Sequence, residues 1–427
     1  MNELPVHKRK FHAFLSHAHA DNKIVDNLNH WLNEVAGIPI WYDASNLQLG
    51  AQIATELPKA IAQCRAMILI LSKSSVASGW VQEEYEAAMS QRTQFKEFRI
   101  IPVRIEECDI PGLLKTTKWI DLVNGDLHLE TANKLLASLY YSNMEIEPEI
   151  TKDIYVSRTW RESEAQLADH ICLLLDKAGF RLIGDSEDQL GFEEGNRVRS
   201  IISSCGGLAA ILPHRGEGTT SKYMLDEIKI ARDLHLPTLI IADPSVQLPD
   251  DLAESVIPIQ GNEINNVSEV LQAGIEDLKE IWNKPNHPHY IFFATDLDPE
   301  NYPRNQVIRQ IIQRVTAMPG IFGENIRESE VQKVINEKIS SALMMIADIS
   351  DDNINTLIEA GIARGANKQF YLVASGPRRR PPFMFRDQQV WYYEDDIQLL
   401  GIIHKIVYPY RRRVLNNELS KSHTLSL

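Results

Sequence analysis

Four kinds of segment follow one another in the same order three times along this chain of 427 residues. Each copy opens with an apolar strand that runs into polar residues: FHAFLSHAHADN from residue 11, DIYVSRTWRESE from 153 and YIFFATDLDPEN from 290. A helix end then leads into a buried strand: AIAQCRAMILILS from 60, IISSCGGLAAILP from 201 and KISSALMMIADIS from 338. The copies lie about 140 residues apart, whereas solenoid repeats are usually 20–50 residues long.

The second half of each copy repeats in the same way. A helix that carries a glutamate comes first: SGWVQEEYEAAM from 78, SKYMLDEIKIAR from 221 and NINTLIEAGIAR from 353. A strand closes the pattern: FRIIPVRI from 98, LPTLIIAD from 236 and KQFYLVAS from 368. Such alternation is typical of βαβ units around a parallel sheet. We therefore expect an α/β fold with three flavodoxin-like parallel-sheet units in tandem. The alternative is that any three α/β domains share this rhythm.

Two stretches interrupt both the helical and the strand periodicity, and they predict the domain boundaries. The acidic stretch NMEIEPEITKD covers residues 143–153, and WNKPNHPH covers 282–289. Proline, asparagine and histidine in such stretches favour loops over regular structure. The expected domains are residues 1–142, 150–283 and 288–410.

Net charge and apolar patterning disfavour several classes of protein. The formal net charge is −14, and nucleic-acid binding is unlikely because neutralising phosphates requires a basic surface. The basic runs Arg378–Arg380 and Arg411–Arg413 are interpreted as solvated charges, with an anion contact as the alternative. We expect no membrane helix, no secretory signal and no metal site. Four cysteines without CxxC spacing, three of them in apolar patterns, indicate buried free thiols in a cytoplasmic protein.

Three loops of the first unit should meet at one edge of its sheet. Ser16 and His17 follow the first strand, Asp43–Gly50 follows the second, and Ser72–Ser78 follows the buried strand. Ligands of open parallel sheets bind beyond the carboxyl ends of the strands, so the three loops predict one crevice. Gly50 fits either a close approach to a ligand or a simple turn before the next helix.

Helical phase separates the three glutamates of SGWVQEEYEAAM. With Ser78 as the N-cap, Glu84 lies about 40° around the helix from Trp80 and one turn further along. Glu83 and Glu86 fall about 60° and 120° from Trp80 on the other side. Glu86 is expected to be a solvated charge, and Glu83 a charge at the helix start that the helix dipole favours. Glu84 is therefore the inward-facing carboxylate. Trp80 either offers a π-face to a cationic ring or fills the gap between helix and sheet.

Residues 9–125 resemble the TIR domain family, particularly its bacterial members. The resemblance rests on FLSHAHADN, the loop Asp43–Gly50, the ILS strand end and the set Ser78, Trp80 and Glu84. It implies TIR-like units and an enzyme that cleaves the nicotinamide–ribose bond of NAD, with Glu84 as the catalytic residue. It also implies NAD contacts by Ser16, His17, Asp43, Gly50 and Trp80. His17 is followed by Ala18, where NAD-active members often carry an aromatic or basic residue.

The second unit repeats the spacing of the helix with a tyrosine, because Tyr223 precedes Glu227 by four residues. Its loop GDSEDQLGFEEG is longer and more acidic than the corresponding loop of the first unit. We interpret this unit as a degenerate TIR-like copy. It is a sensor or assembly surface, a scaffold, or a second NAD-cleaving site.

The third unit resembles nucleoside 2-deoxyribosyltransferases and related nucleotide-binding domains. The resemblance rests on ADISDDNINTLIEAGIARGANK, with Asp348, Asn353, Asn355, Glu359, Gly361, Ala363 and Lys368. It implies a second ligand site at Asp348, Asn353, Asn355 and Glu359. The alternatives are a nucleotide-sensing pocket, an active transferase or hydrolase, and a structural role.

Together these features predict an NAD+ glycohydrolase that acts in bacterial anti-phage defence. An activating nucleotide or protein partner would bind the C-terminal units and drive self-assembly through the TIR domains. The product is either ADP-ribose or a cyclised form. One alternative is a non-catalytic TIR adaptor, and another is a nucleoside-processing enzyme centred on Glu359.

Overall fold

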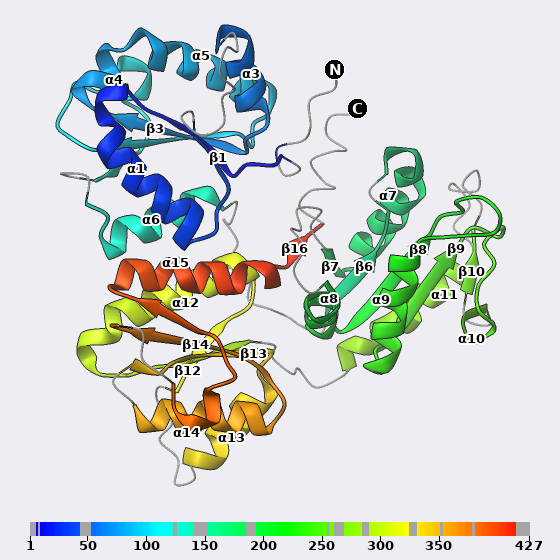
Figure 1. The fold of residues 1–427 in the computed structure, drawn as a ribbon. Coiled ribbons are helices and arrows are strands. Elements are labelled where there is room, and N and C mark those ends of the chain that lie inside the picture. The colour runs from blue at the N-terminus through cyan, green and yellow to red at the C-terminus, as the bar shows by residue number, and fades with distance from the viewer. Residues whose placement is uncertain are drawn as a thin grey trace. The chain divides into compact units, whose positions relative to one another are not determined.

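The computed structural model shows three separate β-sheets (Figure 1). It describes the following residues: 6, 9–42, 53–122, 126–140, 152–159, 161–184, 194–253, 256–259, 269–283, 290–323, 331–350, 353–377 and 381–415. The loop containing Asp43 and Gly50, the acidic loop at 185–193 and the basic run 378–380 lie outside these residues, so predictions about them stay predictions.

The first sheet has five parallel strands in the order β2-β1-β3-β4-β5. The strands are β1 (Ala13–Ser16), β2 (Ile40–Tyr42), β3 (Ala66–Leu71), β4 (Arg99–Arg104) and β5 (Ile120–Asp121). The helices are α1 (Asn22–His30), which continues as a π-helical segment (Trp31–Val35), then α3 (Ile53–Ala62), α4 (Lys73–Ala77), α5 (Gly79–Gln94) and α6 (Leu129–Leu139).

The second sheet repeats this order with one addition. Its parallel strands are β6 (Asp153–Ser157), β7 (Arg181–Gly184), β8 (Gly207–Leu212), β9 (Thr238–Ala242) and β10 (Val256–Pro258). The C-terminal strand β16 (Arg413–Val414) pairs antiparallel with β7 at one edge. The helices are α7 (Glu162–Lys177), α8 (Glu194–Ser203), α9 (Lys222–Asp233), α10 (Asp250–Ala253) and α11 (Glu269–Leu278).

The third sheet has the order β12-β11-β13-β14-β15, and all its strands are parallel. They are β11 (Ile291–Ala294), β12 (Gly320–Phe322), β13 (Met344–Asp348), β14 (Gln369–Ser375) and β15 (Val390–Tyr393). The helices are α12 (Tyr302–Thr316), α13 (Val331–Ser341), α14 (Ile354–Gly365) and α15 (Asp396–Val407).

The predicted fold class is confirmed, because each unit has the flavodoxin-like order 2-1-3-4-5 of parallel strands. The central strands are continuous apolar runs, and β3, β8 and β13 are buried along their whole length, as strands covered on both faces must be. The expectation that the fourth strand closes each unit is wrong. A fifth strand follows in each, and two of the three are only two or three residues long, too short for a hydrophobic pattern.

The chain divides into two compact bodies. The first contains residues 1–145, 291–340 and 344–408, and thus the first and third units; the second contains 146–290, 341–343 and 409–427. In the first body, Trp31 Nε1 donates to the carbonyl of Ile397 at 2.9 Å. His404 is fully buried between Tyr140 and the carbonyl of Ala36, which its Nδ1 contacts at 2.7 Å. The three-domain boundaries predicted above stay a prediction.

In the second body, one basic run behaves differently from the prediction. The basic run Arg411–Arg413 predicts a solvated charge at Arg412, but the side chain of Arg412 is fully buried against the carboxylate of Asp153. Asp153 is also fully buried and accepts a bond of 2.5 Å from Arg181 Nε. The solvated interpretation of Arg412 is therefore wrong, because β16 joins the second sheet and carries Arg412 into its interior.

Candidate active site

The helix that carries Glu84 begins as its sequence predicts. Ser78 is the N-cap of α5 with an extended backbone, and its side chain makes no capping hydrogen bond. Glu84 is 2% exposed, whereas Glu83 and Glu86 on the same helix are exposed. Helical phase predicts that Glu84 faces inward, and its burial confirms this.

Glu84 meets the first strand at the carboxyl edge of the sheet. The hydroxyl of Ser16, the last residue of β1, donates a short hydrogen bond to Glu84 Oε2. Ser16 pairs in register with Leu69 of β3, so the contact lies between β1 and β3, at the point where the strand order reverses. This topological switch point is where open α/β sheets bind their ligands.

Two more contacts join the loops around this corner. The N-cap of α4, Ser72, donates to Asp21 Oδ2 at 2.7 Å and thereby ties the loop after β3 to the loop after β1. His17 stacks on Tyr42 with ring centroids 5.2 Å apart, and its Nε2 lies 3.1 Å from Asn22 Oδ1. The structure thus brings Ser16, His17 and the end of β2 to one edge, as predicted. Asp43, Gly50 and the side chain of Trp80 lie outside what the structure describes.

The second unit contains the same constellation. Glu227 lies six residues after the N-cap Ser221 of α9, as Glu84 lies six after Ser78. It is 2% exposed and accepts from Ser157, the last residue of β6, at 2.5 Å. Tyr155 adds a second bond of 2.5 Å to Glu227. Ser157 pairs with the fourth residue of β8 just as Ser16 pairs with the fourth residue of β3.

The third unit keeps the glutamate and changes its partner. Glu359 lies six residues after Asn353, the N-cap of α14. At the register position of Ser16 stands Ala294, which pairs with the fourth residue of β13 and has no hydroxyl to donate. Burial raises the pKa of Glu359 to about 7.

The other predicted residues of the third unit have local partners. Asn353 uses its side chain to cap α14, accepting from the amides of Asn355 and Thr356 at 3.0 and 3.2 Å. Asn355 is exposed. Asp348 is buried and accepts from Tyr393 at 2.8 Å and from Ser350 at 2.5 Å. Asp348 is the last residue of β13, and Glu359 lies in α14, the helix that follows it. The side chain of Asn353 caps that helix. The ligand site stays a prediction.

Sequence reasoning placed Ser16 at this corner without identifying its contact with Glu84. The strand ends FLSH, YVSR and FFAT carried that signal, because serine occupies the same position in the first two and alanine in the third. Tyr155 was missed, since an aromatic residue inside an apolar strand gives no sign of a buried hydroxyl contact. Among the described residues, no group of three or more His, Cys, Asp or Glu side chains is arranged to hold a metal ion. No helix that the structure describes is long and apolar enough to cross a membrane.

The first unit is thus an α/β domain with a flavodoxin-like parallel sheet and a buried carboxylate, Glu84, at the switch point of that sheet. The family model of the TIR domain matches residues 13–136, so this unit is a TIR domain. Over 95 residues the chain is 30% identical to the NAD(+) hydrolase TcpA of Theionarchaea archaeon (strain DG-70-1). The matched part is 22% of this chain and 28% of that protein, so the chain spans less than a third of that relative.

Solved structures add only weak likenesses. The TIR domain of the Toll-related receptor TRR-2 from Hydra magnipapillata is 19% identical, with 30% of this chain and 98% of that one covered and a TM-score of 0.27. The C-terminal domain of glucosamine-fructose-6-phosphate aminotransferase from Francisella tularensis is 10% identical, with 68% and 88% covered and a TM-score of 0.20. At these scores neither likeness bears on function.

Proposed function

We propose that this protein is an NAD+ glycohydrolase that breaks the nicotinamide–ribose bond at Glu84 of its TIR domain. One observation carries the proposal: the Glu84 carboxylate is held at the switch point of the TIR sheet by the hydroxyl of Ser16. The distant likeness to an NAD(+) hydrolase supports the same substrate.

A single fixed carboxylate suits this reaction. The leaving nicotinamide is cationic in NAD and departs as a neutral molecule, so it needs no general acid. Positive charge develops on the ribose as the bond breaks, in the manner of an oxocarbenium ion. A preorganised anion beside that charge stabilises the transition state more than the ground state. In this proposal Glu84 supplies the anion, and Ser16 holds it in one rotamer.

The burial of Glu84 supports an activation step. Because the residue is only 2% exposed, NAD reaches its carboxylate only after neighbouring side chains move. We propose that assembly of TIR domains, driven by a ligand or partner of the C-terminal units, produces this opening. The resemblance to bacterial TIR proteins supports a role in anti-phage defence, with ADP-ribose or a cyclised form as product.

The decisive experiment follows nicotinamide release from NAD by the full chain, alone and with candidate activating nucleotides. Glu84→Gln removes the anion and keeps the hydrogen-bonding shape, and release should fall by about 100-fold or more. The matched control is Glu86→Gln on the exposed face of the same helix, where the rate should stay within about twofold of wild type. Equal rates in wild type and Glu84→Gln would favour the adaptor role.

A second candidate function has its own observation. The pKa of Glu359 is raised to about 7 by burial, which places its titration near the pH at which a general acid or base works best. Arg304 and Asp348 lie at the same sheet edge, 3.9 Å apart. A nucleoside-processing activity there would release a free base from a nucleoside, and Glu359→Gln would abolish it while Glu84→Gln would not.

A further inference from the structure

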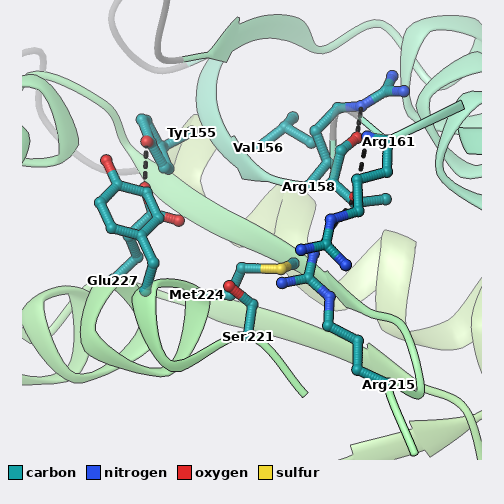
Figure 2. A pocket seen from close by; sticks show the side chains of 10 residues that line it. Tyr155, Val156, Arg158, Arg161, Arg215, Ser221, Met224 and Glu227 are labelled. Carbon is teal, nitrogen blue, oxygen red and sulfur yellow. Dashed lines mark hydrogen bonds between the residues drawn. The ribbon is translucent and has the colours of Figure 1, made fainter. Parts of the chain in front are cut away.

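A cavity of about 330 Å³ opens in the second unit, at the switch point of its sheet (Figure 2). It lies between the carboxyl ends of β6 and β8 and the start of α9, and its lining includes Arg161, Arg215, Tyr223, Met224 and Glu227. The volume is near the lower end of the range of about 300–1,000 Å³ for small-molecule sites. It therefore fits a compact ligand better than a dinucleotide.

One corner of the cavity carries excess positive charge. Arg215 Nη2 lies 3.0 Å from Glu164 Oε2, and Arg161 Nη1 lies 3.5 Å from Glu164 Oε1. Two guanidinium groups thus share one carboxylate, and Figure 2 shows both directed toward the region above Met224 and Ser221. In the described part of the chain, Arg215 Nε is buried without a hydrogen-bond partner.

The third arginine of the lining does not add to this charge. Arg158 Nη2 pairs with Asp169 Oδ1 at 2.7 Å, and in Figure 2 its guanidinium group turns away from the other two. The anion-binding corner is therefore formed by Arg161 and Arg215. A guanidinium group presents its N–H donors in a planar fork that matches the oxygens of a phosphate.

The rest of the lining suits the nucleoside part of a ligand. Tyr223 is 43% exposed, so part of its ring is accessible, and Met224 lines the cavity with it. An accessible aromatic face stacks on nucleobases, and it does so without regard to base identity. The carboxylate of Glu227 lines the cavity as an acceptor, which is the group that ribose hydroxyls contact.

The TIR domain has no arginine at the positions equivalent to the two residues of the anion-binding corner. Counted from the matched strand ends Ser157 and Ser16, Arg161 corresponds to Ala20. Counted from the ends of β8 and β3, Arg215 corresponds to Ser74. The second unit thus keeps the glutamate and adds two cations, and its ligand differs from that of the first.

From these observations we propose that the cavity of the second unit is a binding site for a nucleoside monophosphate. The phosphate is held by Arg161 and Arg215, the base by Tyr223, and the ribose lies toward Glu227. The N-terminal end of α9, whose N-cap Ser221 makes no side-chain cap, adds the positive end of a helix dipole to the same site. Binding at this site does not require NAD cleavage at Glu84.

Isothermal titration calorimetry of the full chain tests the proposal with AMP, GMP, CMP and UMP. Adenosine, ribose 5-phosphate and inorganic phosphate are the partial probes. At least one monophosphate should bind, and each partial probe should bind at least about tenfold more weakly, because each lacks one group that the site contacts. No binding by any of the four monophosphates overturns the proposal. Inorganic phosphate that binds as tightly as the best monophosphate overturns the nucleotide assignment.

Variants then locate the site. Arg215→Gln and Arg161→Gln should each weaken the best monophosphate by about 10- to 100-fold, the range of a charge-assisted hydrogen bond. Arg161 is 64% exposed at its side chain, so its variant decides the matter if Arg215→Gln fails to fold. The control Arg199→Gln removes an exposed arginine of the same unit and should leave the affinity unchanged. Equal weakening by the control overturns the site.

A last variant separates this proposal from the proposed function. Glu84→Gln should bind the monophosphate as wild type does, whether or not the chain cleaves NAD. Loss of binding in Glu84→Gln with none in Arg161→Gln would place the ligand in the TIR domain and overturn the inference.

Discussion

Ser16 and Glu84 are joined by a side-chain hydrogen bond that spans 68 positions of the chain. Ser157 and Glu227 repeat this bond in the second unit across 70 positions, and Ala294 removes it from the third. The three units therefore share one scaffold. The first two position the glutamate with an equivalent serine, and the third lacks it.

Ser16→Ala removes the donor to Glu84 and leaves the carboxylate in place. We expect kcat for nicotinamide release to fall by about tenfold, the cost of one hydrogen bond to a charged group, with a smaller change in KM. Ser16→Thr keeps a hydroxyl and should recover part of the rate. The matched change Ser157→Ala in the second unit should leave NAD cleavage at the wild-type rate. A normal kcat in Ser16→Ala would show that Ser16 does not position Glu84.

Gly401→Ala should loosen the packing of the third unit on the first. An added Cβ at Gly401 would lie 2.7 Å from Val35 Cγ1 and 3.3 Å from the amide of Ala36. We expect a loss of about 1–3 kcal/mol in the free energy of unfolding, the usual cost of overpacking. The control is Gly365→Ala in α14, where nothing lies within 4 Å, and which should be neutral or stabilise by up to about 1 kcal/mol. Thermal melting of both variants against wild type measures the difference.

Glu359 should make the stability of the chain depend on pH. Burial raises its pKa from 4.5 to about 7, so the folded state binds the proton more tightly than the unfolded state. Stability is then highest below pH 4.5 and falls as pH rises toward 7, by at most about 3 kcal/mol. Glu359→Gln should remove most of this loss, so its urea midpoint should exceed that of wild type at pH 8 and match it at pH 4.

The exposed Glu337 of α13 provides the control, and Glu337→Gln should follow wild type at both pH values. A wild-type midpoint that does not fall between pH 4.5 and 7 relative to Glu359→Gln would contradict the raised pKa.

Asp153→Asn should destabilise the second body strongly. The change leaves Arg412, which is fully buried, and Arg181 without their shared counter-charge. Breaking a buried ion pair from one side costs about 3–5 kcal/mol. Asp233→Asn breaks a pair whose side chains are about half exposed and 3.9 Å apart, and should cost less than about 1 kcal/mol. Urea unfolding of the two variants compares the costs, and similar values would mean that the buried pair contributes no more than a surface pair.

The thiols should differ in reactivity. Cys64, Cys172 and Cys205 are buried, and burial raises the pKa of Cys172 to about 11 and that of Cys205 to about 12. Cys108 is only partly buried. At pH 8 a thiol reagent should label one of the four cysteines quickly in the native protein, and all four in urea. Cys108→Ser should abolish the fast phase; a fast phase that persists would contradict the burial of the other three.

The sequence alone determined the features that depend on neighbouring residues. The buried strands are continuous apolar runs, and the inward position of Glu84 follows from the helical repeat, so both are visible within a dozen residues. The tertiary structure alone decided which distant groups meet. Ser16 meets Glu84, and Arg161 and Arg215 meet at the carboxylate of Glu164, because the carboxyl ends of parallel strands lie at one edge of a sheet. Arg412 meets Asp153 because β16 joins the second sheet antiparallel to β7. No pattern within a short stretch of sequence shows which of these distant residues come into contact. The short fifth strands escaped prediction for the related reason that two or three residues carry no periodicity, and only their neighbours in the sheet make them strands.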